Sequence, residues 1–158
     1  MLLSSEIRPE NFAPHLRERI RGQLQSTKQY TQGGMHQRRF GGIVSEWDDY
    51  LRLFQGAGDE KAVGEGSVCY LWSKSASSAI ASHLPHSKII IVLMDPAARA
   101  FAQYQNSVWD GHVHHSFREH LDECFRNPGD TFSVFHPFLE FGMYNKQVAR
   151  YITDFPRE

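Results

Sequence analysis

The residues whose types and spacing best suit chemistry lie between positions 95 and 104, where Asp95, Pro96 and Arg99 occur in quick succession. Asp95 is suited to cap a helix. Pro96 is suited to its first position, because proline fixes φ and lacks an amide hydrogen that the first turn leaves unpaired. The apolar run 89–93 just before them predicts a strand buried on both faces. In α/β sheets, the junction between such a strand and a helix N-terminus often binds an anion. The alternative is an ordinary turn that binds no ligand.

Two other motifs accompany this stretch: Gly64-Glu65-Gly66-Ser67-Val68-Cys69-Tyr70 upstream and Phe141-Gly142-Met143-Tyr144 downstream. With residues 94–104 they resemble the sulfotransferases that use 3′-phosphoadenosine-5′-phosphosulfate (PAPS), in the heparan-sulfate-type branch and its bacterial relatives. The likeness spans residues 45–156. It implies an α/β, P-loop-NTPase-like fold with an incomplete parallel sheet flanked by helices, and transfer of a sulfuryl group from PAPS to a hydroxyl or amine.

The departures from the family pattern fall on residues that the resemblance places at the cofactor. Met94 and Ala102 occupy the positions of an Arg and a Ser that hold the 3′-phosphate, and neither side chain donates a hydrogen bond to phosphate. Gly66 stands at the position of a Lys that assists transfer. The resemblance also assigns Asp95, Arg99 and Ser67 to the cofactor, and Tyr144 to the substrate. We therefore expect weakened binding of PAPS.

The family's glycine-rich loop for the 5′-phosphosulfate has no counterpart in this sequence. In the family a glutamate shortly after this loop acts as general base. Glu6 is the carboxylate nearest to that place in this sequence, and no motif gives it the role. These absences predict a single partial sulfotransferase domain over residues 1–158, a truncated, split or degenerate form that is inactive alone. The alternative is a non-catalytic binding module derived from a sulfotransferase. A third class, the P-loop kinases and nucleotidases, shares the expected architecture but depends even more strictly on the glycine-rich loop that this sequence lacks.

Charge and composition restrict the partners. The formal net charge of −1 argues against nucleic acid as a partner. Residues 1–40 form a basic helical arm, near +4, which predicts a solvated amphipathic helix or an edge that meets an anionic acceptor. The sequence has no long apolar run, and we expect a cytoplasmic protein without membrane contact that acts on a small-molecule or glycan acceptor. Cys69, in an apolar strand, and Cys124, on a helix, are predicted to be unpaired thiols.

Periodicity and capping signals predict the elements. Helices are expected at 14–30, at 46–55 behind a Ser45–Asp48 capping box, at 75–84, from 96 through 104, from a Ser116–Glu119 box to about 125, and from Pro137 through Tyr151. Strands at 61–64 and 89–93 would form one βαβ unit. Two parallel strands need neighbours, so we expect self-association or a partner that supplies the missing strands.

Histidines cluster at His112, His114 and His115. Three histidines so close together resemble a set of metal ligands, but no Cys, Asp or Glu is spaced to complete the set, so no metal site is predicted. No histidine pairs in sequence with a Ser or Cys nucleophile, which leaves triad chemistry without support.

Overall fold

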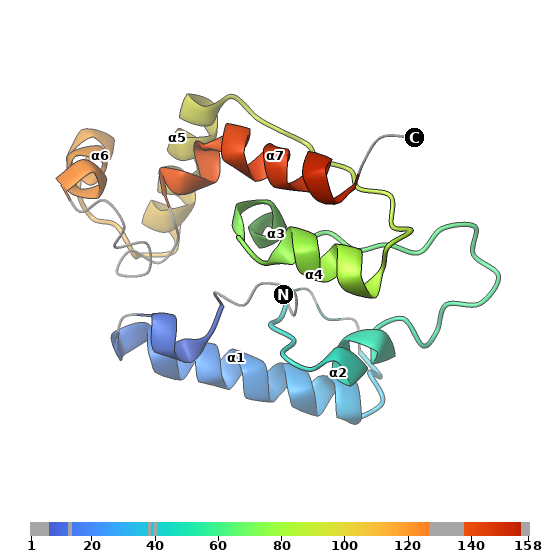
Figure 1. Cartoon of the computed structure of the whole chain (residues 1–158). Coiled ribbons are helices and arrows are strands. Elements are labelled where there is room, and N and C mark those ends of the chain that lie inside the picture. The colour runs from blue at the N-terminus through green and yellow to red at the C-terminus, as the bar shows by residue number, and fades with distance from the viewer. Residues whose placement is uncertain (1–6, 13, 38, 40, 127–137, 156–158) are drawn as a thin grey trace. The chain divides into compact units, whose positions relative to one another are not determined.

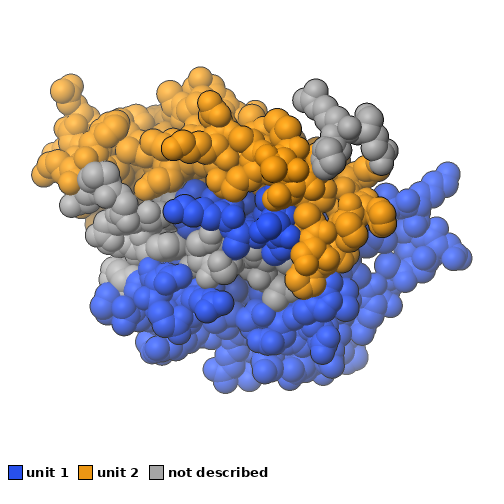
Figure 2. All heavy atoms as spheres, in the orientation of Figure 1, with its two compact units in different colours: residues 1–80 blue, residues 81–158 orange. Residues whose placement is uncertain are grey.

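The structure is a computed structural model that describes residues 7–12, 14–37, 39, 41–126 and 138–155. The chain divides into two compact units, Met1–Ile80 and Ala81–Glu158 (Figure 2). The described residues form α-helices joined by loops and 3-10 turns (Figure 1). None of these helices is long and apolar enough to cross a membrane.

The first unit contains η1 (Pro9–Asn11), α1 (Pro14–Gln32), α2 (Trp47–Arg52), α3 (Val68–Trp72) and most of α4 (Ala76–His83). The face of α1 that carries Leu16 and Ile20 is buried, as predicted for an amphipathic helix over 14–30. The segment after α1 runs close to this helix at Gly42, where an added Cβ would lie 2.9 Å from Thr27 Oγ1. Buried Ile43 and Val44 complete this part of the core.

Helix α2 is shorter than the predicted 46–55. Its N-cap is Glu46, which makes no side-chain capping bond, so the predicted Ser45–Asp48 box is wrong. The predicted aromatic face is present, because Trp47 stacks on Tyr50 and Tyr50 meets Phe54 edge-on, each at 5.2 Å between ring centroids.

The second unit contains α5 (Pro96–Trp109), α6 (Phe117–Arg126), η2 (Glu140–Gly142) and α7 (Tyr144–Asp154). Aromatic rings join α5 to α6, and α6 to Phe138 just before η2. The Phe117 ring lies 5.2 Å from those of Phe101 and Tyr104, and the His120 ring lies 4.6 Å from that of Phe138. The predicted helices at 75–84, 96–104 and 116–125 are confirmed, and α5 continues to Trp109. The predicted start of the last helix at Pro137 lies outside the described residues, and α7 begins at Tyr144.

The predicted α/β fold with a parallel sheet is wrong for the described residues, none of which lies in a β-strand. The segment 89–94 has no regular structure and none of its side chains is buried: Ile90 and Val92 are each 88% exposed, whereas Ile89 and Ile91 are partly buried. The physical reason is the lack of a partner: a strand exists by pairing its amides and carbonyls with a neighbour, and this segment has none among the described residues.

The other predicted strand, at 61–64, is also an exposed loop, with Val63 53% exposed. Cys69 lies on the short helix α3 instead of a strand, and it is buried. Cys69 and Cys124 are both free thiols, and Cys124 lies on α6 as predicted.

Candidate functional site

The N-terminus of α5 is built as its sequence predicts. Asp95 is the N-cap and its Oδ1 accepts a hydrogen bond of 2.9 Å from the Ala98 amide, while Pro96 occupies the first turn. The cap has a chemical consequence, because the protein's own carboxylate already uses one of the amides that an anion would need. An anion at this end of α5 therefore depends on side-chain donors from neighbouring positions.

Arg99 lies one turn into α5 and is held by the protein rather than turned to solvent. Its guanidinium donates to Gln103 Oε1 at 2.5 Å and to the carbonyl oxygen of Phe138, and it lies 5.9 Å from the centre of the Phe138 ring. Burial lowers the pKa of the guanidinium, and Tyr144 and Glu140 nearby oppose that shift. Arginine stays charged throughout the physiological range, so Arg99 is a fixed, partly buried cation.

The downstream motif meets the start of α5. A Cβ added to Gly142 would lie 3.4 Å from Pro96 Cβ and 3.5 Å from Arg99 Nε, so this glycine packs directly on the first turn. Tyr144, at the start of α7, is close enough to affect the pKa of Arg99. Two of the three motifs singled out in the sequence therefore lie side by side, and Tyr144, Arg99 and Asp95 belong to one local site.

The two substituted positions flank this site along the chain. Met94 directly precedes the cap and is 55% exposed, and Ala102 lies on the second turn of α5 with a partly buried side chain. Neither side chain offers a donor to a phosphate.

The upstream motif belongs to the first unit. Gly66 is exposed, and Ser67 is the N-cap of α3 without a side-chain capping bond. Glu65 Oε1 lies 3.5 Å from the hydroxyl of Tyr50, and burial together with this carboxylate raises the pKa of Tyr50 to about 12. The same two causes, burial first, raise the pKa of Tyr70. Glu65 is thus the residue of this motif that acts on the pKa of both tyrosines.

A second group of polar side chains lies at the start of α6, where His115, His120 and Glu123 come together. The sequence analysis did not predict this group, because it grouped His115 with its sequence neighbours His112 and His114 rather than with residues of the following helix. A signal was available: the predicted Ser116–Glu119 box fixes where the helix begins, and positions 120 and 123 then share a helix face.

Comparison with solved structures finds a sulfotransferase from Alicyclobacillus acidocaldarius, with a TM-score of 0.67 and 31% sequence identity. The match covers 82% of this chain and 56% of that protein, so this chain spans little more than half the length of its structural neighbour. No protein-family model matches the chain, and no curated protein does. The similarity in sequence and structure supports the relationship to sulfotransferases that the motifs predicted.

Proposed function

We propose that this chain is part of a PAPS-dependent sulfotransferase and provides the surface that receives the 3′-phosphate of the donor. The observation that carries the proposal is the match to a sulfotransferase at 31% identity, combined with the packing of Gly142 against Pro96 and Arg99. The match alone supports the reaction class. The local geometry supports the choice of the start of α5 as the place where the donor would bind.

The reaction would transfer a sulfuryl group to a hydroxyl or amine. A bond forms between the acceptor oxygen or nitrogen and sulfur, the bond from sulfur to the 5′-phosphate oxygen breaks, and adenosine 3′,5′-bisphosphate leaves. The acceptor proton must pass to a base. In this chain Asp95 sets the start of α5 and Arg99 ties it to the 138–144 segment, so both act as positioning residues for the cofactor surface.

Binding of adenosine 3′,5′-bisphosphate tests the proposed surface. Because Met94 and Ala102 cannot donate to phosphate, we expect calorimetry to show a dissociation constant no tighter than the high micromolar range. The double variant Met94→Arg, Ala102→Ser should bind about thirty- to a thousandfold more tightly, equivalent to about 2–4 kcal/mol.

The control is Trp109→Arg, which adds the same charge at the far, exposed end of α5 and should leave binding unchanged. Submicromolar binding by the natural sequence would contradict the role given to positions 94 and 102. An unimproved double variant would favour the other reading, a binding module that has lost the cofactor surface.

Transfer is measured separately with radiolabelled PAPS and a panel of phenols, sugars and amines. We expect no turnover above the buffer control from this chain alone, since donors that stabilise a transferring group each contribute about a hundred- to a thousandfold. Turnover that disappears in Arg99→Ala would overturn this expectation. Turnover only after a second polypeptide with a phosphate-binding loop is added would support a divided enzyme.

A further inference from the structure

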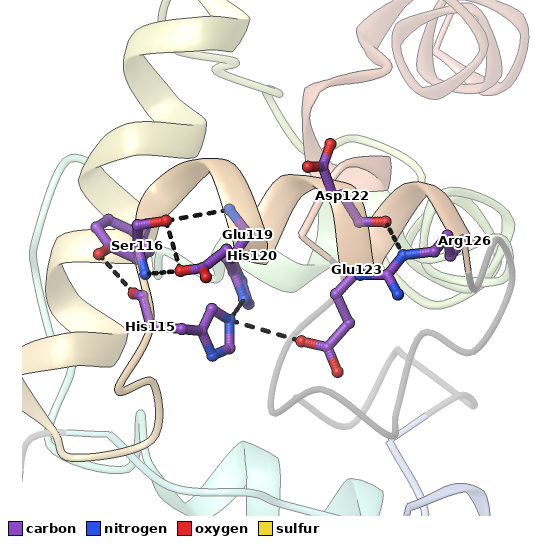
Figure 3. A network of polar contacts seen from close by, with 8 residues as sticks. His115, Ser116, Glu119, His120, Asp122, Glu123 and Arg126 are labelled. Atoms are coloured by element: carbon purple, nitrogen blue, oxygen red, sulfur yellow. Dashed lines mark hydrogen bonds and ion pairs between the residues drawn. The ribbon is translucent and has the colours of Figure 1, made fainter.

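Three side chains of the second unit converge beside the first turns of α6 (Figure 3). His115 Nε2 lies 3.3 Å from His120 Nδ1 and 3.5 Å from Glu123 Oε2. One ligand atom from each of the three residues lies within 4.8 Å of the others. Two imidazoles and one carboxylate are a donor set found in zinc sites that keep an open fourth position.

The two separations from His115 Nε2 are close to those between two ligands of one ion. A hydrogen bond to nitrogen or oxygen usually measures about 2.9–3.0 Å, and both contacts of His115 Nε2 are longer. In a tetrahedral zinc site with bonds of about 2.0–2.1 Å, neighbouring ligand atoms lie about 3.3–3.4 Å apart. The ligand atoms of His120 and Glu123 lie within 4.8 Å of each other, and small side-chain rotations would bring the Glu123 carboxylate closer to both histidines.

The local structure fixes the backbone that carries these ligands. Glu119 Oε2 accepts from the Ser116 amide at 2.8 Å and from its hydroxyl at 2.7 Å, and the Glu119 amide donates back to Ser116 Oγ at 3.3 Å. This capping box confirms the one predicted from sequence. It sets the helix start between His115 and His120, and the Tyr104 hydroxyl holds the His115 carbonyl at 2.9 Å.

Burial and charge suit the cluster to a cation. His120 is only 2% exposed and packs edge-on against the Phe138 ring, so its imidazole has little freedom. His120 Nδ1 lies 3.3 Å from His115 Nε2, so this ring nitrogen faces the other ligand atoms of the cluster. The side chains of His115 and Glu123 are 39% and 52% exposed, which leaves the ion a route from solvent and room for water as a fourth ligand.

We propose that His115, His120 and Glu123 form a binding site for Zn²⁺ or a chemically similar divalent transition metal. The proposal rests on this geometry alone and is independent of the sulfotransferase assignment. The competing arrangement, a metal-free contact between two histidines and a glutamate, is an outcome of the test.

The test uses the whole chain without a polyhistidine tag. Titration with ZnCl₂ by calorimetry should show one ion bound per chain with a dissociation constant of micromolar or tighter. Co²⁺ in place of Zn²⁺ should give the intense visible absorption of a four-coordinate ion. Zn²⁺ should also raise the midpoint of thermal unfolding, and a chelator should reverse the shift.

The exposed ligands are the ones to change, because replacing buried His120 threatens the fold. His115→Ala and Glu123→Gln should each weaken Zn²⁺ binding at least tenfold, and the double variant should lose the cobalt spectrum. His114→Ala, an exposed histidine next to the site, is the matched control and should bind within twofold of the natural sequence. Binding weaker than about 100 μM, or affinity that is unchanged in His115→Ala and Glu123→Gln, would overturn the proposal.

Discussion

Arg99 shows how one residue of the proposed cofactor surface also has a structural role. Its donors reach Gln103 within α5 and the carbonyl of Phe138 from a segment about forty positions later. A guanidinium engaged in this way is pre-oriented, since its planar donors are fixed by two acceptors. The sequence places Arg99 near the start of a helix, where the structure has it, but spacing alone gave no means of finding Phe138 as its partner, because that contact depends on tertiary packing.

Arg99→Ala should therefore destabilise the fold. The change leaves the partly buried Phe138 carbonyl without its charged donor, and we expect a loss of about 1–3 kcal/mol in the free energy of unfolding. Denaturant titration followed by circular dichroism measures the loss. Arg126→Ala, which removes an exposed arginine from α6, is the control and should cost less than about 0.5 kcal/mol. Equal effects of the two changes would rule out a special role for Arg99.

Tyr50 provides a prediction about pH at the same scale. The pKa of its phenol is about 12 in the folded protein and near 10 without the fold, so the unfolded state loses this proton first. The contribution to stability is complete below pH 10 and disappears as the pH rises from 10 through about 12. Difference absorbance titration between the natural sequence and Tyr50→Phe should isolate a phenol that ionises near pH 12.

Glu65→Gln separates the causes of that shift. Burial is the larger cause and remains in this variant, whereas the carboxylate is removed, so the pKa of Tyr50 should fall part of the way towards 10. A pKa of Tyr50 that does not move in Glu65→Gln would show that burial alone raises it.

Among the elements, α5 has the best-defined start, and its cap is open to a direct test. Asp95→Ala removes the acceptor for the Ala98 amide and should cost about 0.5–2 kcal/mol in the free energy of unfolding, whereas Asp95→Asn should retain most of the stability. Asp110→Ala, at the other end of the same helix, removes a negative charge where the helix dipole disfavours one and should be neutral or slightly stabilising. Chemical denaturation of the three variants compares them, and similar losses at both ends would argue against the cap.

The elements also show which parts of the fold could be predicted from the sequence. Helices α1, α4, α5 and α6 follow from local signals that act within a few residues: apolar spacing, a proline at the first turn and the Ser116–Glu119 box. The predicted strands at 61–64 and 89–93 were wrong, because β-branched composition favours an extended backbone but does not supply the neighbouring strand that it must pair with. The contact of Gly142 with Pro96 joins distant positions and carried no sequence signal.

For the whole molecule, the most consequential feature is the exposed apolar segment 89–94. Its alternating side chains leave Ile90, Val92 and Met94 at 88%, 88% and 55% exposure, and its backbone makes no hydrogen bond with the described residues. Such a segment is a template for pairing with another chain. Lys88 and Asp95 flank it, so two copies that pair antiparallel would set opposite charges against each other at both ends.

We therefore expect the isolated chain to self-associate through residues 89–94. Light scattering should show a mass that rises with protein concentration, and the double variant Ile90→Lys, Val92→Lys should reduce association because charges on the paired face repel and resist burial. Trp109→Lys with Ile152→Lys changes two other exposed apolar residues of the same unit and should leave association largely intact. A monodisperse, cooperatively unfolding monomer at all concentrations would contradict this expectation, since it would mean that the segment is stable in water without a neighbouring strand.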